Sequence, residues 1–225
     1  GGTNNAFGWG VAVDGSGNVH VTGHFDETVD FGAGNVTSAG NYDVFVTKLN
    51  SSGVHQWTTT FGAAGPNAAD RGYGVAVDGS GNVHVTGHFS GTVNFGAGNV
   101  TAAGGPDVFV TKLNSSGVHQ WTTTFGGTGA AAYSRQVAVD GSGNVHVTGY
   151  FEGTVDFGAG DVASAGDYDV FVTKLNSSGA HQWTTTFGGT HAGGDYGESV
   201  AVDGSGNVHV TGYFEGTVNF GAGNV

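Results

Sequence analysis

The chain lacks several residue types that most globular cores use. It has no cysteine, no methionine and no isoleucine, and its only leucines are Leu49, Leu113 and Leu175. Without cysteine, no disulfide bond can form. Because the long aliphatic residues are nearly missing, the core has to be built from Val, Ala, Phe, Tyr and Trp. This composition favours strands over helices.

Positive charge and long apolar runs are also scarce. Five Lys and Arg residues face eighteen Asp and Glu residues, so the net charge is −13. This balance disfavours nucleic acid and anionic membranes as partners. No apolar run approaches the ~18 residues that a membrane-spanning helix requires, so we expect no membrane insertion. Full protonation of the ten histidines would change the net charge to −3 (−13 + 10). We therefore expect self-association to increase near pH ~6.

Glycine, with 46 residues, and one repeated motif are abundant. The motif VAVDGSGNVHVTG occurs at 11–23, 75–87, 137–149 and 200–212. The aspartates of the four copies are 64, 62 and 63 residues apart, and the length varies only in the Gly/Ala-rich joints between units. Insertions gather in surface connections, so we interpret the joints as links between structural units.

Each unit predicts four strands, which in the first unit lie at 11–14, 18–25, 43–50 and 55–62. The second strand alternates, with His20, Thr22 and His24 on one face and apolar residues on the other. Residues 28–40 predict an extra loop or small hairpin. Four consecutive antiparallel strands form one meander sheet, and packed copies of it give an all-β propeller. A β-solenoid-like open repeat array is the alternative.

The blades are predicted at residues 1–62, 63–126 and 127–188, with a partial blade of two strands at 189–225. The stretches VAVDGSGNVHVTGYFEGTVDFGAG and YDVFVTKLNSSGAHQWTTTFGG resemble the bacterial beta-propeller repeat called SBBP, and the resemblance covers essentially the whole chain. It implies a many-bladed propeller in a secreted or cell-surface bacterial protein, and it supplies no catalytic residue. Because a ring needs more blades than this, we expect a portion of a longer repeat protein.

The loop DGSGN has two interpretations. Asp14, Ser16 and Asn18 place oxygen atoms at positions 1, 3 and 5, as in acidic calcium loops. The equivalent loops begin at Asp78, Asp140 and Asp203. Only one of the three side chains is a carboxylate, and no Glu stands at position 12. We therefore interpret the loop as a hairpin turn, in which the aspartate accepts N–H bonds and the glycines take positive φ. Weak calcium binding is the alternative.

No pattern predicts catalysis. His20 and His24 are ~13 Å apart along one strand, too far to share a zinc ion. The serines of DGSG and NSSG recur in every unit, whereas an active site is normally singular. We therefore predict no enzyme activity, no catalytic residue and no cofactor apart from that calcium alternative. Each complete unit has a tryptophan at the same position of its fourth strand, namely Trp57, Trp121 or Trp183, and we expect these side chains to pack between sheets.

Two functions agree with this sequence. The first is an extracellular or cell-surface scaffold, structural or adhesive, that self-associates into a fibre or surface layer through threonine-rich edge strands. The second is a ligand-binding propeller module that recognises a glycan or a protein through the joints between blades. Tyr73, Tyr133 and Tyr196 precede the first strand of their units, and they are the candidates for the ligand face.

Overall fold

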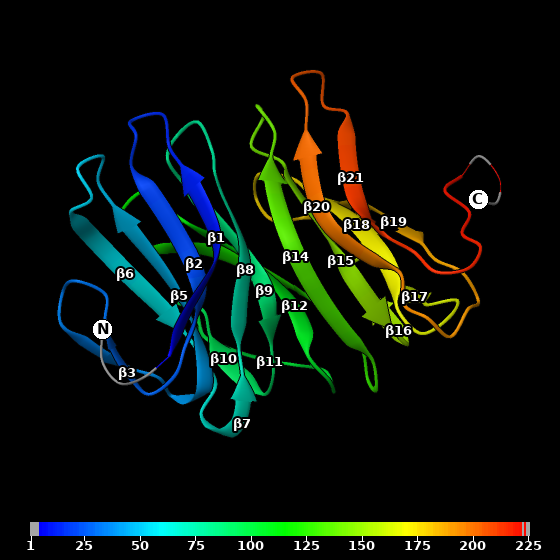
Figure 1. Ribbon diagram of the computed structural model, residues 1–225, viewed down its shortest axis with the longest axis horizontal. Helices are drawn as coiled ribbons and strands as arrows, with labels where there is room; N and C mark the ends of the chain where they lie inside the picture. Colours follow the sequence, from blue (N-terminus) through cyan, green and yellow to red (C-terminus); the bar gives the residue numbers. More distant parts are fainter. Residues whose placement is uncertain (1–4, 222, 224–225) are drawn as a thin grey trace.

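The computed structural model describes residues 5–221 and 223, and its regular elements are strands in consecutive antiparallel sheets (Figure 1). Blade 1 contains β1 (Ala6–Val13), β2 (Val19–Phe25), β5 (Gly40–Leu49) and β6 (His55–Phe61). Blade 2 contains β8 (Arg71–Val77), β9 (Val83–Phe89), β12 (Asp107–Leu113) and β13 (His119–Phe125). Blade 3 contains β14 (Ala131–Val139), β15 (Val145–Glu152), β18 (Asp169–Leu175) and β19 (His181–Phe187). Blade 4 is a half blade with β20 (Tyr196–Val202) and β21 (Val208–Tyr213).

These sheets confirm the predicted all-β class with three four-stranded repeats and one partial repeat. The strands of each sheet are paired in chain order, as in a meander. Within residues 5–221 and 223, no helix is long and apolar enough to cross a membrane.

The segment predicted as an extra loop or hairpin is a hairpin in all three complete blades. The pairs are β3 (Thr28–Asp30) with β4 (Asn35–Thr37), β10 (Thr92–Asn94) with β11 (Asn99–Thr101), and β16 (Thr154–Asp156) with β17 (Asp161–Ala163). In blade 2, the ring centroid of Phe95 lies 5.3 Å from that of Phe89, 5.1 Å from that of Phe109 and 5.5 Å from that of Phe61 in blade 1. The hairpin therefore contributes an aromatic side chain to the interface between two blades.

The core lies between successive sheets, which explains why the strands carry apolar residues on both faces. One cluster joins Val44, Val46 and Phe61 of blade 1 to Val85 and Phe89 of blade 2, all of them buried. An equivalent cluster joins blade 2 to blade 3. Burying each of these side chains contributes about 1.5–3 kcal/mol. The units thus stabilise one another through nearest-neighbour contacts, as in other repeat proteins.

The tryptophan in the fourth strand of blades 1 and 2 forms a hydrogen bond with the next blade. Trp57 Nε1 donates a hydrogen bond to the carbonyl oxygen of Ser115 in blade 2, at 3.1 Å. Trp121 makes the same bond to Ser177 of blade 3, at 3.2 Å. The prediction that these residues pack between sheets is thus confirmed for two of the three. Trp183 is 36% exposed.

The first strands of the blades pack beside one another: β1 against β8, β8 against β14, and β14 against β20. Figure 1 shows the blades arranged in chain order, with blade 1 and blade 4 at opposite ends of the long axis. The sheets do not close into a ring. At one end Trp9, Val11 and Val13 of β1 are exposed, and at the other end Val210 and Tyr213 of β21 are exposed.

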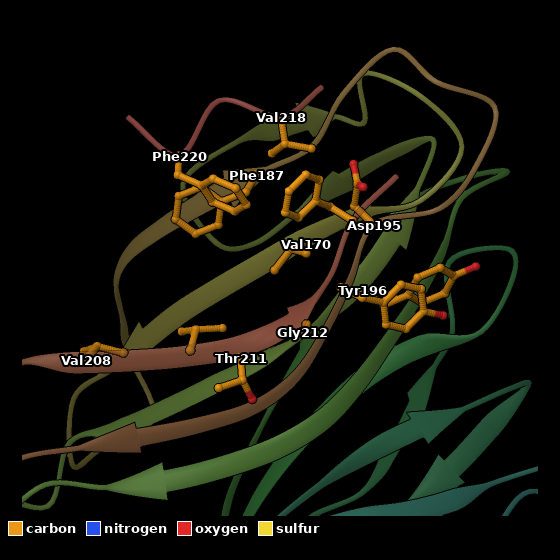
Figure 2. A pocket seen from close by; sticks show the side chains of 13 residues that line it. Val170, Phe187, Asp195, Tyr196, Val208, Thr211, Gly212, Val218 and Phe220 are labelled. Carbon is orange, nitrogen blue, oxygen red and sulfur yellow. The ribbon is translucent and has the colours of Figure 1, made fainter. Parts of the chain in front are cut away.

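A cavity of about 500 Å³ lies beside β21, where the third strand stands in the complete blades. Figure 2 shows Val170 and Phe187 from blade 3 facing this space, together with Val208, Val218 and Phe220. In blade 3 the matching edge of β15 is paired along its length with β18. The cavity therefore lies along the edge of β21 that corresponds to the paired edge of β15.

The first joint contains β7 (Gly65–Ala69), a strand that was not predicted. It pairs in parallel with β5, so it belongs to the sheet of blade 1 although its residues fall in the second predicted unit. The joint is fastened by the buried carboxylate of Asp70, which accepts bonds from the backbone N–H of Ala63, at 2.7 Å, and of Ser90, at 2.9 Å. This carboxylate links the end of blade 1 to blade 2.

Candidate ligand-binding site

The first strand of each blade carries a bulge, and the four bulged residues are chemically different. The strands begin earlier than predicted, and the extra residues pair with the end of the second strand. In each case the pairing skips one residue, namely Trp9, Tyr73, Arg135 or Glu198. A bulge re-aims a side chain and is common next to functional sites. Units that share the motif VAVDGSGNVHVTG therefore carry different side chains at the bulged position.

Other positions at this end of the blades also differ between the units. Two residues before the bulge stand Phe7, Arg71, Tyr133 and Tyr196. Their cross-strand partners on the second strand are His24, His88, Tyr150 and Tyr213. Tyr42, Pro106 and Tyr168 directly precede the conserved Asp of the third strand within each complete unit. The variation is therefore concentrated at one end of the repeat array.

All seven tyrosines of the chain lie at this end, in one continuous row of rings. Tyr73 lies 5.7 Å from Trp9 and 5.6 Å from His88, between ring centroids. His88 lies 4.9 Å from Tyr133, and Tyr133 lies 5.2 Å from Tyr150. The row then continues through Tyr196 to Tyr213 in blade 4. Rings at these separations make favourable edge and offset contacts, so the row is held rigidly across the four blades.

Both arginines of the chain lie in the same row. The Arg135 guanidinium is sandwiched between two rings, 5.1 Å from the centroid of Tyr73 and 5.2 Å from that of Tyr150. Its Nη2 donates a hydrogen bond to the Tyr150 hydroxyl at 3.2 Å, and its Nε lies 3.8 Å from the carboxylate of Glu198. The Arg71 guanidinium lies over the ring of Tyr42 at 5.2 Å. Contacts of this kind hold a guanidinium by its flat face.

These residues form a groove of about 560 Å³, which we call the aromatic groove. It is lined by Ala69, Arg71, Tyr73, His88, Ser90, Pro106, Tyr133, Arg135, Tyr150, Tyr168 and Tyr196. Its volume is in the range, roughly 300–1,000 Å³, of small-molecule sites. Apolar ring faces alternate in it with hydroxyl and guanidinium donors, so it can stack a flat or ring-shaped ligand and hydrogen-bond its edges.

His88 is a buried polar side chain of the aromatic groove, only 6% exposed. Burial, together with the charges of Arg71 and Arg135, lowers the pKa of His88 to about 3. The imidazole is therefore neutral at physiological pH. Its Nδ1 is buried without a hydrogen-bond partner among the described residues. An unsatisfied buried nitrogen of this kind is costly.

The predicted ligand-face tyrosines are all brought together here, although they are not equivalent to one another. Tyr73 is a bulged residue, whereas Tyr133 and Tyr196 stand two residues before a bulge. Arg71, Arg135 and the tyrosines outside the joints were not predicted as site residues. A position-by-position comparison of the four units contains the signal, because these are the positions at which otherwise near-identical units diverge.

The DGSGN loops lie at the other end of the strands and have the geometry of the predicted hairpin turn. Asp14 Oδ1 accepts the backbone N–H of Ser16 and of Asn18, both at 2.9 Å, and Oδ2 accepts the Asn18 side-chain amide at 2.7 Å. Gly17 has φ 78°, the left-handed conformation that favours a glycine, whereas Gly15 does not have a positive φ, so the prediction of positive φ is correct only for the second glycine of the turn. Equivalent bonds occur at Asp78, Asp140 and Asp203.

Nitrogen donors thus occupy the carboxylates proposed as calcium ligands. In addition, Lys48 Nζ lies 3.6 Å from Asp14 Oδ2, and Ser16 donates its backbone N–H to Asp14 Oδ1 instead of offering an oxygen ligand. In the part of the chain that the structure describes, no three His, Cys, Asp or Glu side chains are grouped to hold a metal ion. Calcium binding at these loops stays a prediction, and the cation would have to displace these donors.

The expectation that the histidines become protonated near pH ~6 does not hold for His24, His84 and His88, whose pKa falls to about 4 or about 3. Burial lowers the pKa of His20, His24, His84, His88, His119 and His146. Mild acid therefore removes less of the negative charge than the histidine count indicates.

The fold defines the chain as an all-β tandem repeat protein with propeller-type blades, and the aromatic groove runs across these blades. Comparison with known families then identifies the repeat. The SBBP model, described as a beta-propeller repeat, matches residues 56–88, 120–150 and 182–213, so the chain contains three repeats of this type. Each match runs from the fourth strand of one blade through the first two strands of the next.

A curated relative is known from a giant virus. The chain is 26% identical, over 182 residues, to the "Uncharacterized WD repeat-containing protein L264" of Acanthamoeba polyphaga mimivirus. The match covers 70% of this chain and 12% of the viral protein, so the chain corresponds to a small fraction of that relative's length. Both comparisons agree with a repeat protein.

Proposed function

We propose that this chain is a non-enzymatic binding module that recognises a glycan in the aromatic groove. The observation that carries the proposal is the distribution of sequence differences between the units. The turn ends of the blades repeat one sequence, whereas the opposite ends hold all seven tyrosines and both arginines at positions that differ from unit to unit. A purely architectural repeat has no need for such divergence at one end.

The chemistry of the groove favours a saccharide. Tyrosine and tryptophan rings offer flat apolar faces, and the C–H faces of sugar rings stack on them. Hydroxyl groups of tyrosine and guanidinium groups of arginine offer donors at the ring edges for sugar hydroxyls. Because the rings contact one another across blades 1 to 4, the surface is preorganised, and little side-chain entropy has to be lost on binding.

Alanine variants of Tyr73 and Tyr133, probed on a glycan array and by calorimetry, test this proposal. We expect each variant to lose binding to the glycans that the wild type selects. Trp183→Ala is the matched control, because it removes an aromatic side chain that is 36% exposed and lies outside the aromatic groove. Wild-type binding by both tyrosine variants, or the absence of any glycan bound by the wild type, would contradict the proposal.

A structural or adhesive scaffold is the second candidate, and the outer strands favour it. Among the described residues, β6, β13 and β19 each pair with one neighbouring strand only, and their sequence HQWTTTF contains neither Lys nor Pro. Such edges are open to pairing with another chain. Filaments seen by electron microscopy without any ligand would support this function. The extracellular location implied by the resemblance is part of both proposals, and fractionation of the native source tests it.

A further inference from the structure

The charges of the aromatic groove narrow the ligand class. Building on the proposed glycan function, we propose that the groove selects acidic saccharides, whose carboxylate or sulfate group binds to the guanidinium groups of Arg71 and Arg135. The saccharide rings then lie on the adjoining tyrosines. The inference depends on where the few cationic side chains of this acidic chain lie.

The three lysines are already paired at the far ends of the blades. Lys48 lies 3.6 Å from Asp14, Lys112 lies 3.3 Å from Asp78 and Lys174 lies 3.7 Å from Asp140, between Nζ and Oδ2. Each pair belongs to a repeated hairpin turn. Of the five cationic side chains in the sequence, only the two arginines remain, and both line the aromatic groove.

Both arginine side chains line the groove and are partly exposed, which leaves guanidinium N–H groups for a ligand. Their Nε atoms are buried and have no hydrogen-bond partner among the described residues, so the contacts with a ligand have to come from the terminal Nη groups. The ion pair of Arg135 is long, with Nε 3.8 Å from a carboxylate oxygen of Glu198. Because tyrosine rings hold each guanidinium by its face, its N–H edge is left for an acceptor. Carboxylate and sulfate oxygens match this fork with charge-assisted hydrogen bonds.

The buried side chain of His88 in the groove is neutral, so it adds no charge to that of the arginines beside it. His88 stands opposite Arg71 across β8 and β9, and its buried Nδ1 has no partner. Burial and the two nearby guanidinium charges hold its imidazole neutral. The positive charge in the groove is therefore that of the two arginines, which Glu198 compensates only in part at 3.8 Å from Arg135 Nε, and an incoming anion neutralises it further.

The far end of the row limits how much negative charge the ligand can carry. Besides burial, the carboxylates of Glu152 and Asp167 raise the pKa of Tyr168, and Glu215 contributes to the raised pKa of Tyr196. Like charges repel, and the whole chain carries −13. An anionic group at the arginines with neutral rings beyond it fits this gradient, whereas a dense polyanion is repelled.

The test compares matched ligands by calorimetry with the full chain. The probes are a trisaccharide of uronic acid, its fully methyl-esterified form, a neutral trisaccharide of the same linkage, and a trisaccharide bearing one sulfate. We expect the acid to bind at least about tenfold more tightly than its ester, as the loss of charge-assisted hydrogen bonds predicts. Preference for the sulfated probe would support the inference and identify sulfate as the anion.

Arg71→Gln and Arg135→Gln are each expected to lose that preference. Lys174→Gln is the control, because it removes the same charge at the opposite end of blade 3 and should bind like the wild type. Arg71→Lys and Arg135→Lys keep the positive charge but remove the planar fork of N–H donors, so we expect them to lose part of the preference for the acid. These variants serve as the test if a glutamine variant fails to fold.

The outcomes separate this inference from the proposed function. Equal affinity for the acid and its ester overturns the acidic specificity but leaves glycan binding intact. Wild-type acid preference in both folded arginine variants overturns the assignment of the anion site. If the chain binds none of the four probes and no glycan on an array, the proposed function and this inference both fail.

Discussion

Gly87 occupies a position where even a methyl group should disrupt both the fold and the aromatic groove. It pairs with Gly72, immediately before the bulge that projects Tyr73. A Cβ atom at Gly87 would overlap the carbonyl oxygen of Arg71 and lie 2.8 Å from a ring carbon of Phe109. The first of these atoms is backbone, so β8 and β9 would have to move apart.

The expected cost of Gly87→Ala follows from that overlap. Overpacking in a well-packed site costs typically about 1–3 kcal/mol, and a backbone clash places this variant at the upper end. A chain of this size changes its melting temperature by about 2–4 °C per kcal/mol, so we expect a decrease of about 6–12 °C. The circular dichroism of the strands and the near-ultraviolet signal of the tyrosines should be followed together during heating.

Gly79→Ala is the matched control for this experiment. No atom lies within 4 Å of a Cβ built at Gly79, in the turn between the same two strands, and its backbone is not in the left-handed region. We expect a change within about 1 kcal/mol, or slight stabilisation, because alanine restricts the unfolded chain. If Gly87→Ala melts at the temperature of Gly79→Ala, the close approach of β8 and β9 is wrong.

Three further variants test the packing and the turns. Trp121→Ala should destabilise the chain by about 2–4 kcal/mol in urea unfolding, and Trp183→Ala by much less, because only Trp121 bonds to the next blade; equal effects would contradict the inter-blade role. Burial raises the pKa of Asp78, but hydrogen bonds from Asn82 outweigh this effect and lower the pKa below its ordinary value. The ionised Asp78 therefore stabilises the folded chain above pH ~4, and this contribution is lost in acid. Asp78→Ala should therefore cost about 1–3 kcal/mol at pH 7 and much less at pH 2, and a gap that does not narrow refutes this. Burial raises the pKa of Asp70 to about 6, so its folded form holds a proton that the unfolded chain has lost. Its contribution falls as pH rises from about 4 to about 6, by up to about 3 kcal/mol, and Asp70→Asn should remove that slope in melting experiments.

Much of the blade could be predicted because its signals are local. The sequence DGSGN combines an Asp that caps N–H groups with a glycine at positive φ, and it recurs as the same turn in all four units. The alternation of residue types likewise predicts the second strand and its two faces, and the tryptophan at a fixed position of the fourth strand predicts packing between sheets. These features depend on residues close in sequence, and the repetition shows them four times.

The groove could not be predicted in the same way, because it is assembled across blades. Arg135 meets Tyr73 only when β8 and β14 lie side by side, and the skipped residue in each first strand is set by strand pairing. Likewise, β7 was missed because its parallel pairing with β5 depends on how the first joint folds back. The tyrosines in the joints were visible in the sequence, but their convergence with the arginines needs the packed array.

Tyrosine rings give the most direct test of the central claim, since five of the seven tyrosines line the aromatic groove that we assign to ligand binding. The measurement is an NMR titration of the chain, ¹³C-labelled at tyrosine and phenylalanine rings, with the uronic acid trisaccharide. The account predicts that tyrosine signals shift with saturation, while those of buried Phe109 and Phe171 do not. Saturable binding measured by calorimetry without tyrosine shifts, or no shift at millimolar ligand, would contradict it.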